Sequence, residues 1–138
     1  MFVSFSQPTV SKLLHQIVDL INAHVLSLQI RFPTSDEDFR SLIAGYQRTF
    51  NGVMPEVWGV IDGTLIATVS PPIHSENFPA RVYRTRKGFT GLNVIVISDS
   101  DGKFSYVNAR FPGACHDSSI LRTSLARLRL VNEFERTG

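Results

Sequence analysis

Apolar residues recur at helical spacing in the first part of the chain. Ser6, followed by a proline in the first turn, is typical of a helix start. The apolar positions that follow lie on one face of a predicted helix: Val10, Leu13, Leu14, Ile17, Val18, Ile21 and Val25. A second helix is predicted from Thr34, because Glu37 stands at capping-box spacing and acidic residues occupy its first turn. Its expected buried stripe is Phe39, Leu42, Ile43 and Tyr46.

After these helices the pattern changes to that of strands. Val57–Ile61 is a short, almost continuous apolar run, and we expect Asp62 to end this first strand. Leu92–Ile97 is a second, β-branched run. The Asp101-Gly102 turn then predicts a hairpin, with Phe104–Phe111 returning antiparallel to the second strand.

Pro112 and Gly113 break the third strand, and a further helix is predicted near Asp117, with Asp117 or Ser118 as its cap. The order of helices and strands predicts a mixed α/β (α+β) fold with a mixed sheet under helical cover. No internal repeat or linker-like stretch interrupts it.

The amino-acid composition further narrows the class of protein. A chain of 138 residues with 43% hydrophobic content is long enough for one ordinary core. The single Cys115 excludes an intrachain disulfide framework and favours a reducing compartment. No leader pattern or run of membrane-spanning length is present, so secretion and membrane insertion are disfavoured.

Two carboxylates are candidates for metal chemistry. Asp62 follows an apolar strand, where its alternative role is that of a turn residue before a glycine. Asp117 lies at a helix start, where its alternative role is capping. Divalent cations need carboxylate oxygens from separate elements, which such a pair supplies. Asp99 and Asp101 fit local backbone hydrogen bonding in the hairpin turn.

Two other groups of residues invite a functional interpretation. Cys115 and His116 are adjacent, but neighbouring side chains point in different directions, so we do not expect a nucleophilic dyad. Arg84, Arg86 and Lys87 precede the second strand and could contact phosphates; the alternative is a solvated loop.

Several blocks of the sequence together resemble the PIF/Harbinger transposases and the Harbinger-derived nucleases. They stand in the family's order: Gly59-Val60-Ile61-Asp62-Gly63-Thr64, Arg86-Lys87-Gly88, Asn93-Val94, Asp101-Gly102-Lys103-Phe104 and Phe111-Pro112-Gly113-Ala114-Cys115-His116-Asp117-Ser118. The resemblance implies an RNase H-like catalytic domain of the DDE type in which Asp62 and Asp117 bind Mg²⁺ or Mn²⁺. Leu65 departs from it, because the family commonly has His there.

The resemblance also implies how the chain is organised. Residues 1–30 resemble the end of a helix-turn-helix region whose Ser11 and Lys12 would contact DNA. Residues 31–56 would form a connecting helical segment, and residues 57–138 the first part of the nuclease domain. The family's later acids have no matching block, and Glu133 and Glu135 lack the surrounding motif, so we expect the domain to be incomplete.

The resemblance implies a function as well. We expect a metal-dependent nuclease or transposase-derived protein that acts on DNA phosphodiester bonds by a two-metal mechanism and is inactive as residues 1–138 alone. The alternative is a non-catalytic domesticated module that binds DNA or protein. The family implies the nucleus, with the cytoplasm as a second location, and a protein partner for nuclear import or DNA targeting.

Overall fold

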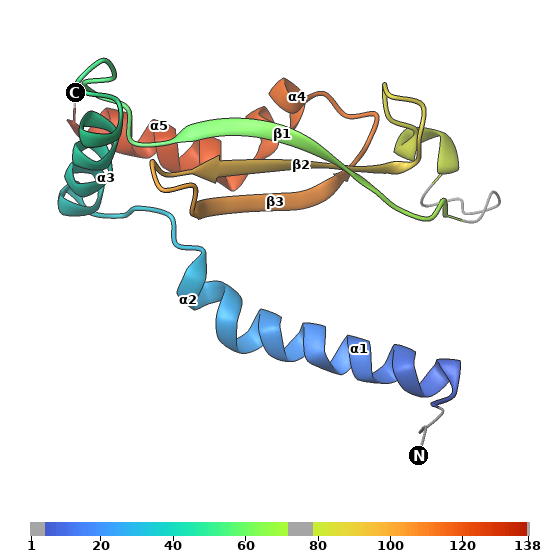
Figure 1. Cartoon of the computed structure of the whole chain (residues 1–138). Coiled ribbons are helices and arrows are strands. Elements are labelled where there is room, and N and C mark those ends of the chain that lie inside the picture. The colour runs from blue at the N-terminus through green and yellow to red at the C-terminus, as the bar shows by residue number, and fades with distance from the viewer. Residues whose placement is uncertain (1–4, 72–78, 138) are drawn as a thin grey trace. The chain divides into compact units, whose positions relative to one another are not determined.

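The computed structural model describes residues 5–71 and 79–137, with side chains described as far as residue 132. By its contacts the chain divides into two compact units, Met1–Arg31 and Phe32–Gly138. Each unit is described by itself. The sheet and the helices that pack on it belong to the second unit (Figure 1).

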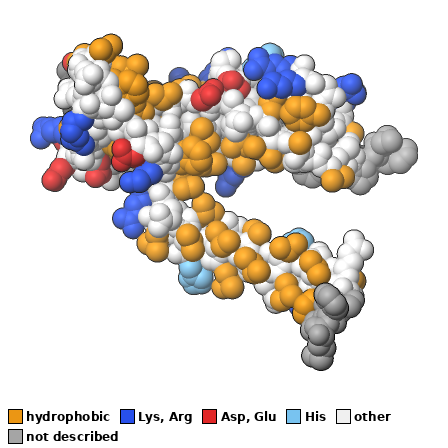
Figure 2. Space-filling view, in the orientation of Figure 1, with side chains coloured by type: hydrophobic (Ala, Val, Ile, Leu, Met, Phe, Trp, Pro, Cys, Tyr) orange, Lys and Arg blue, Asp and Glu red, His pale blue; other side chains and the backbone are white. Residues whose placement is uncertain are grey.

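The first unit is a helical arm. Helix α1 spans Gln7–Ile21 and is followed by a π-helical turn, Asn22–Leu26, and by α2, Ser27–Gln29. The Ser6 side chain caps α1 by accepting a hydrogen bond from the Thr9 N–H, which confirms the predicted start. Its apolar side chains are exposed and spread along the helix (Figure 2).

The second unit is built on a three-stranded sheet in the order β1-β2-β3. The strands are β1 Val60–Ala67, β2 Gly91–Ser98 and β3 Phe104–Pro112, and both neighbouring pairs are antiparallel. The predicted hairpin between the second and third strands is confirmed. The expectation of a mixed sheet is not met within the described residues, since no parallel pair occurs there.

The first strand differs from the prediction in its position. Asp62 does not end it, because β1 continues through Gly63 to Ala67. Every residue of β1 has a partner in β2, from Val60 opposite Ser98 to Ala67 opposite Gly91. Pairing with β2 therefore overrides the turn tendency of the Asp-Gly-Thr sequence.

Helix α3 spans Asp36–Thr49, and its capping box, Ser35 with Asp38, lies one residue later than the predicted box of Thr34 with Glu37. Ser35 is the cap, and Asp38 accepts hydrogen bonds from the Thr34 and Ser35 N–H groups at 3.1 and 3.0 Å. These bonds, led by the one from Thr34, lower the pKa of Asp38. At the other end, Tyr46 donates a hydrogen bond to the Ser98 carbonyl at 3.0 Å, which ties α3 to β2.

A small core connects the sheet to its helical cover. Phe32, Ile97 and Ala126 are buried together, with Trp58, Tyr106 and Leu130 packed against them. The segment before the sheet thus belongs to the same packed unit, with the Phe39 and Trp58 rings 5.2 Å apart.

The C-terminal cover consists of two helices where the sequence predicted one. Helix α4 spans Asp117–Thr123 and α5 spans Leu125–Thr137. They separate at buried Ser124, whose hydroxyl donates to the Leu121 carbonyl and accepts from the Arg127 N–H. Among the described helices none is long and apolar enough to cross a membrane.

Candidate functional site

Asp62 lies inside the edge strand β1, with an exposed side chain. Its Oδ1 accepts a hydrogen bond from the Gly63 N–H at 2.8 Å. This bond comes from the next residue of the same strand and involves no other element. The structure therefore presents a solvated carboxylate that is open to an external ligand.

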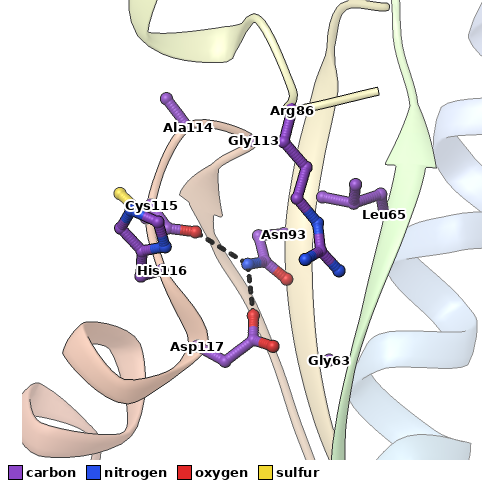
Figure 3. Close-up of a pocket in the computed structure, with 9 residues that line it drawn as sticks. All are labelled: Gly63, Leu65, Arg86, Asn93, Gly113, Ala114, Cys115, His116 and Asp117. Carbon is purple, nitrogen blue, oxygen red and sulfur yellow. Dashed lines mark hydrogen bonds between the residues drawn. The ribbon is translucent and has the colours of Figure 1, made fainter. Parts of the chain in front are cut away.

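Asp117 is the first residue of α4, directly after the turn that follows β3. The helix cap is His116, so the prediction that Asp117 or Ser118 caps this helix is wrong. The Asp117 carboxylate is instead turned toward the sheet. Figure 3 shows the side chain of Asn93 of β2 beside this carboxylate, donating to Asp117 Oδ1 at 2.6 Å and to the Cys115 carbonyl at 2.8 Å.

Gly63 makes room for this carboxylate. A Cβ atom on residue 63 would lie 2.6 Å from Cγ and Oδ1 of Asp117 and 2.7 Å from Oδ2, which is too close for any other residue type without a shift. Asp117 therefore lies against the face of β1 to which Gly63 belongs. Because side chains alternate along a strand, the Asp62 side chain leaves β1 on the opposite face.

Two cavities meet at Asp117. The first, here called the Asp62 cavity, has a volume of about 140 Å³ and is lined by Ile61, Asp62, Gly63, Ile95, Asp117, Ser118 and Leu121. The second, here called the Arg86 cavity, has a volume of about 80 Å³ and is lined by Gly63, Leu65, Arg86, Asn93, Gly113, Ala114, Cys115, His116 and Asp117. Both aspartates thus border the Asp62 cavity, although Asp117 lies against one face of β1 and the Asp62 side chain leaves β1 on the other. A shared ion requires the Asp62 side chain to turn around the free edge of β1.

The three basic residues of the loop before β2 differ in position. Arg86 lines the Arg86 cavity, and its guanidinium points into that cavity between Leu65 and Asn93 (Figure 3). Arg84 and Lys87 are exposed and line neither cavity. The structure thus distinguishes Arg86 from two residues with which the sequence groups it.

The remaining candidates have simpler surroundings. Ser11 and Lys12 are exposed on α1, in the other unit. Asp99 accepts from the Asp101 and Lys103 N–H groups, as expected for a structural turn residue. Asp101 forms an exposed ion pair with Lys103 at 3.7 Å.

Asn93 is the residue whose importance the sequence did not reveal. It is buried, with 4% of its surface exposed, and its Oδ1 has no hydrogen-bond partner among the residues that the structure describes. The available signal was one amide side chain within the apolar run of the second strand, where a buried polar group needs partners.

The described residues of the site supply a few oxygen atoms of the kind that metal sites use. Aspartate oxygens and an amide oxygen are the hard ligands that Mg²⁺ and Mn²⁺ prefer, so the chemistry of the donors fits. Their number is small, because no group of three or more His, Cys, Asp or Glu residues that could hold a metal ion occurs in residues 5–71 and 79–137. We therefore expect only weak binding of an ion by these groups alone.

Comparison with known proteins defines the class. Residues 61–136, more than half of the chain, match the family described as DDE superfamily endonuclease, and the chain belongs to that family. The fold is consistent with the RNase H-like architecture of such domains.

Two relatives make the resemblance more specific. The protein named Putative nuclease HARBI1 from Homo sapiens is 27% identical over 135 residues, and its Mus musculus counterpart is 28% identical. Each alignment covers 96% of this chain but 35% of the relative, so the chain spans about a third of their length. No solved structure matches.

Proposed function

We propose that this chain contributes part of the metal-dependent active site of a transposase-derived nuclease that acts on DNA phosphodiester bonds. The observation that carries the proposal is the Asp117 carboxylate, held by Asn93 against Gly63, on the wall of a cavity that Asp62 also borders. A charge-assisted hydrogen bond from a buried strand is the kind of support that fixes the orientation of a ligand. Membership of the DDE endonuclease family supports the reaction class.

The positions of the two aspartates suggest a role for each in the proposed site. Asp62 and Asp117 would hold divalent cations, Mg²⁺ or Mn²⁺, at the edge of the sheet. When bound, such cations supply an activated water or DNA 3′-hydroxyl and stabilise the leaving oxygen of an in-line displacement. The exposed side chain of Asp62 can reach an ion from the free edge of β1, while Asp117 is oriented before the ion arrives.

DNA would be held by cations on the loop before β2. Arg84, Arg86 and Lys87 are exposed and follow one another closely in sequence. Their contacts would be made with phosphates, which carry no sequence information, so the binding they provide should be nonspecific and sensitive to salt. Ser11 and Lys12 on α1 would add contacts from the helical arm. The nucleus is the proposed location, since DNA is the proposed substrate.

A second candidate function is suggested by the small number of acidic side chains at the proposed site. A module that keeps the sheet and the basic loop but lacks a complete set of ligands would bind DNA or protein without cleaving it. The absence of a larger metal-binding group in the described part of the chain favours this for residues 1–138 taken alone. We therefore expect negligible cleavage by this polypeptide.

Metal binding tests the proposed site. Mn²⁺ titrated into the isotope-labelled chain should broaden the amide signals of Gly63 and Asp117 before those of the hairpin. Asp62→Asn and Asp117→Asn should each weaken this effect, because each removes an anionic ligand. Asp101→Asn is the matched control, since Asp101 is an exposed aspartate that forms an ion pair with Lys103 in the hairpin turn. Equal broadening in all four proteins would contradict the site.

DNA binding tests the loop. Replacing Arg84, Arg86 and Lys87 by glutamine should weaken binding to unrelated DNA sequences alike and reduce the slope of log K against log[salt] by about 3, or about 1 for each lost phosphate contact. Fluorescence anisotropy at several salt concentrations measures this slope. An unchanged slope would exclude the loop from the interface.

A further inference from the structure

The Arg86 cavity contains an acceptor without a donor. Asn93 has an exposed fraction of only 4%, and its Oδ1 has no hydrogen-bond partner in residues 5–71 and 79–137. The orientation of the amide is fixed by chemistry, because its other end contacts two acceptors, the Cys115 carbonyl and the Asp117 carboxylate. The nitrogen must face those two oxygens, so Oδ1 lies at the other end of the amide, on the side of Arg86, where it is occluded from solvent (Figure 3). A buried acceptor of this kind requires a donor or a cation.

This cavity is lined by oxygen-bearing side chains and by one positively charged side chain. Asp117 contributes a carboxylate and Asn93 an amide oxygen, while Arg86 directs its guanidinium between them and Leu65 (Figure 3). No ion pair links Arg86 to Asp117 within 4.0 Å in the described part of the chain. Among the described residues, the guanidinium thus lies in the cavity without an ion-pair partner.

The cavity has the size and chemistry for a hydrated ion. Its volume of about 80 Å³ has room for a few molecules of water, each of which fills about 30 Å³ in the liquid. Magnesium retains several of its waters when few protein ligands are present. Those waters are hydrogen-bond donors, which is what Asn93 Oδ1 and the Asp117 carboxylate need.

We propose that a hydrated divalent cation binds in the Arg86 cavity, between Asp117 and Asn93 Oδ1, and that the Arg86 guanidinium competes with it for this place. The inference rests on the proposed role of Asp117 in metal binding. It places an ion in the second cavity that Asp117 borders, which Asp62 does not line, with Asn93 as a binding residue and Arg86 as a competitor. When the ion enters, Arg86 is released from the cavity. Its guanidinium then becomes available to a phosphate on the same side of the molecule.

The competition predicts an unusual direction of change. Removing a positive charge that lies in the cavity should strengthen cation binding, so Arg86→Gln should bind Mn²⁺ about three- to ten-fold more tightly than the unchanged chain. Arg84→Gln removes the same charge two residues away, outside the cavity, and should change the affinity less than about two-fold at physiological salt because exposed charges are screened. The pair of variants therefore separates local competition from general electrostatics.

The test is a Mn²⁺ titration of the full chain, followed by the paramagnetic broadening of amide signals, which reports weak binding without requiring activity. Tighter binding in Arg86→Gln but not in Arg84→Gln is the expected result, with weaker binding in Asn93→Ala. Equal affinities in Arg86→Gln and Arg84→Gln would overturn the inference. An Asp117→Asn variant that binds Mn²⁺ as well as the unchanged chain would overturn the proposed function itself, so the two failures are distinguishable.

Discussion

Strands β1 and β2 lie side by side and have similar compositions, yet their surroundings are opposite. Both are eight residues long and largely apolar. In the central strand β2 most residues are buried, whereas most residues of the edge strand β1 are exposed. Position in the sheet, more than hydrophobicity, therefore decides which strand can hold a functional group rigidly.

The same difference divides the candidate site. Asp62 belongs to β1 and accepts a hydrogen bond from the N–H of the next residue, while Asp117 is oriented by Asn93 of β2. One carboxylate is thus adaptable and the other is fixed. A metal site with one fixed and one adaptable ligand can bind an ion without a large rearrangement of the core.

The largest expected effect concerns the packing of the two strands. Ile97 of β2 is 2% exposed and belongs to the core cluster, so Ile97→Ala should reduce the free energy of unfolding by about 2–5 kcal/mol. Ile66 of β1 is 49% exposed, and Ile66→Ala should cost less than about 1 kcal/mol. Chemical denaturation measures both values. Similar losses of unfolding free energy in the two variants would show that β1 is buried in solution. The contrast between a buried β2 and an exposed β1 would then be wrong.

A smaller effect is expected at the two aspartates. Asp117→Ala removes the acceptor of a charge-assisted hydrogen bond from a buried amide and should destabilise the protein by about 1–2 kcal/mol. Asp62→Ala removes an exposed carboxylate and should change stability by about 0.5 kcal/mol or less. Thermal unfolding of the two variants in the absence of metal distinguishes the fixed carboxylate from the adaptable one. If Asp62→Ala is the more damaging change, the assignment of roles must be reversed.

Much of this contrast could be predicted from the sequence, and some of it could not. The Asp101-Gly102 turn and the runs on either side fixed the hairpin, because a short turn permits only antiparallel pairing. The length of β1 could not be read in the same way. Asp62, Gly63 and Thr64 have local turn tendencies, and only the register with β2 draws them into a strand.

The site was predictable in kind but not in detail. Metal chemistry could be inferred from Asp62 and Asp117 once the resemblance of the surrounding blocks was recognised, and that assignment stays a prediction. The role of Asn93 could not be inferred, since it depends on a contact across 24 positions of sequence. Gly63 likewise looks like a turn residue in the sequence, whereas in the fold it provides space for a carboxylate.

The smallest expected effect is a dependence on pH at the start of α3, whose Tyr46 is bonded to the end of β2. The Asp38 carboxylate accepts hydrogen bonds from Thr34 and Ser35, and these bonds hold its pKa below the ordinary value of 3.8. A lowered folded-state pKa means that the stabilisation is fully present above the unfolded-state value and is lost as the pH falls through the folded-state value.

The difference in unfolding free energy between the unchanged chain and Asp38→Ala should therefore be constant near neutral pH and should decrease below about pH 4. The effect should be smaller than those at Ile97 and Asp117, because Asp38 is exposed and water competes for the same bonds. Denaturation at a series of pH values measures it, with Asp101→Ala as the control aspartate. A difference that grows as the pH falls would contradict the sign of the pKa shift, and with it the capping geometry at the start of α3.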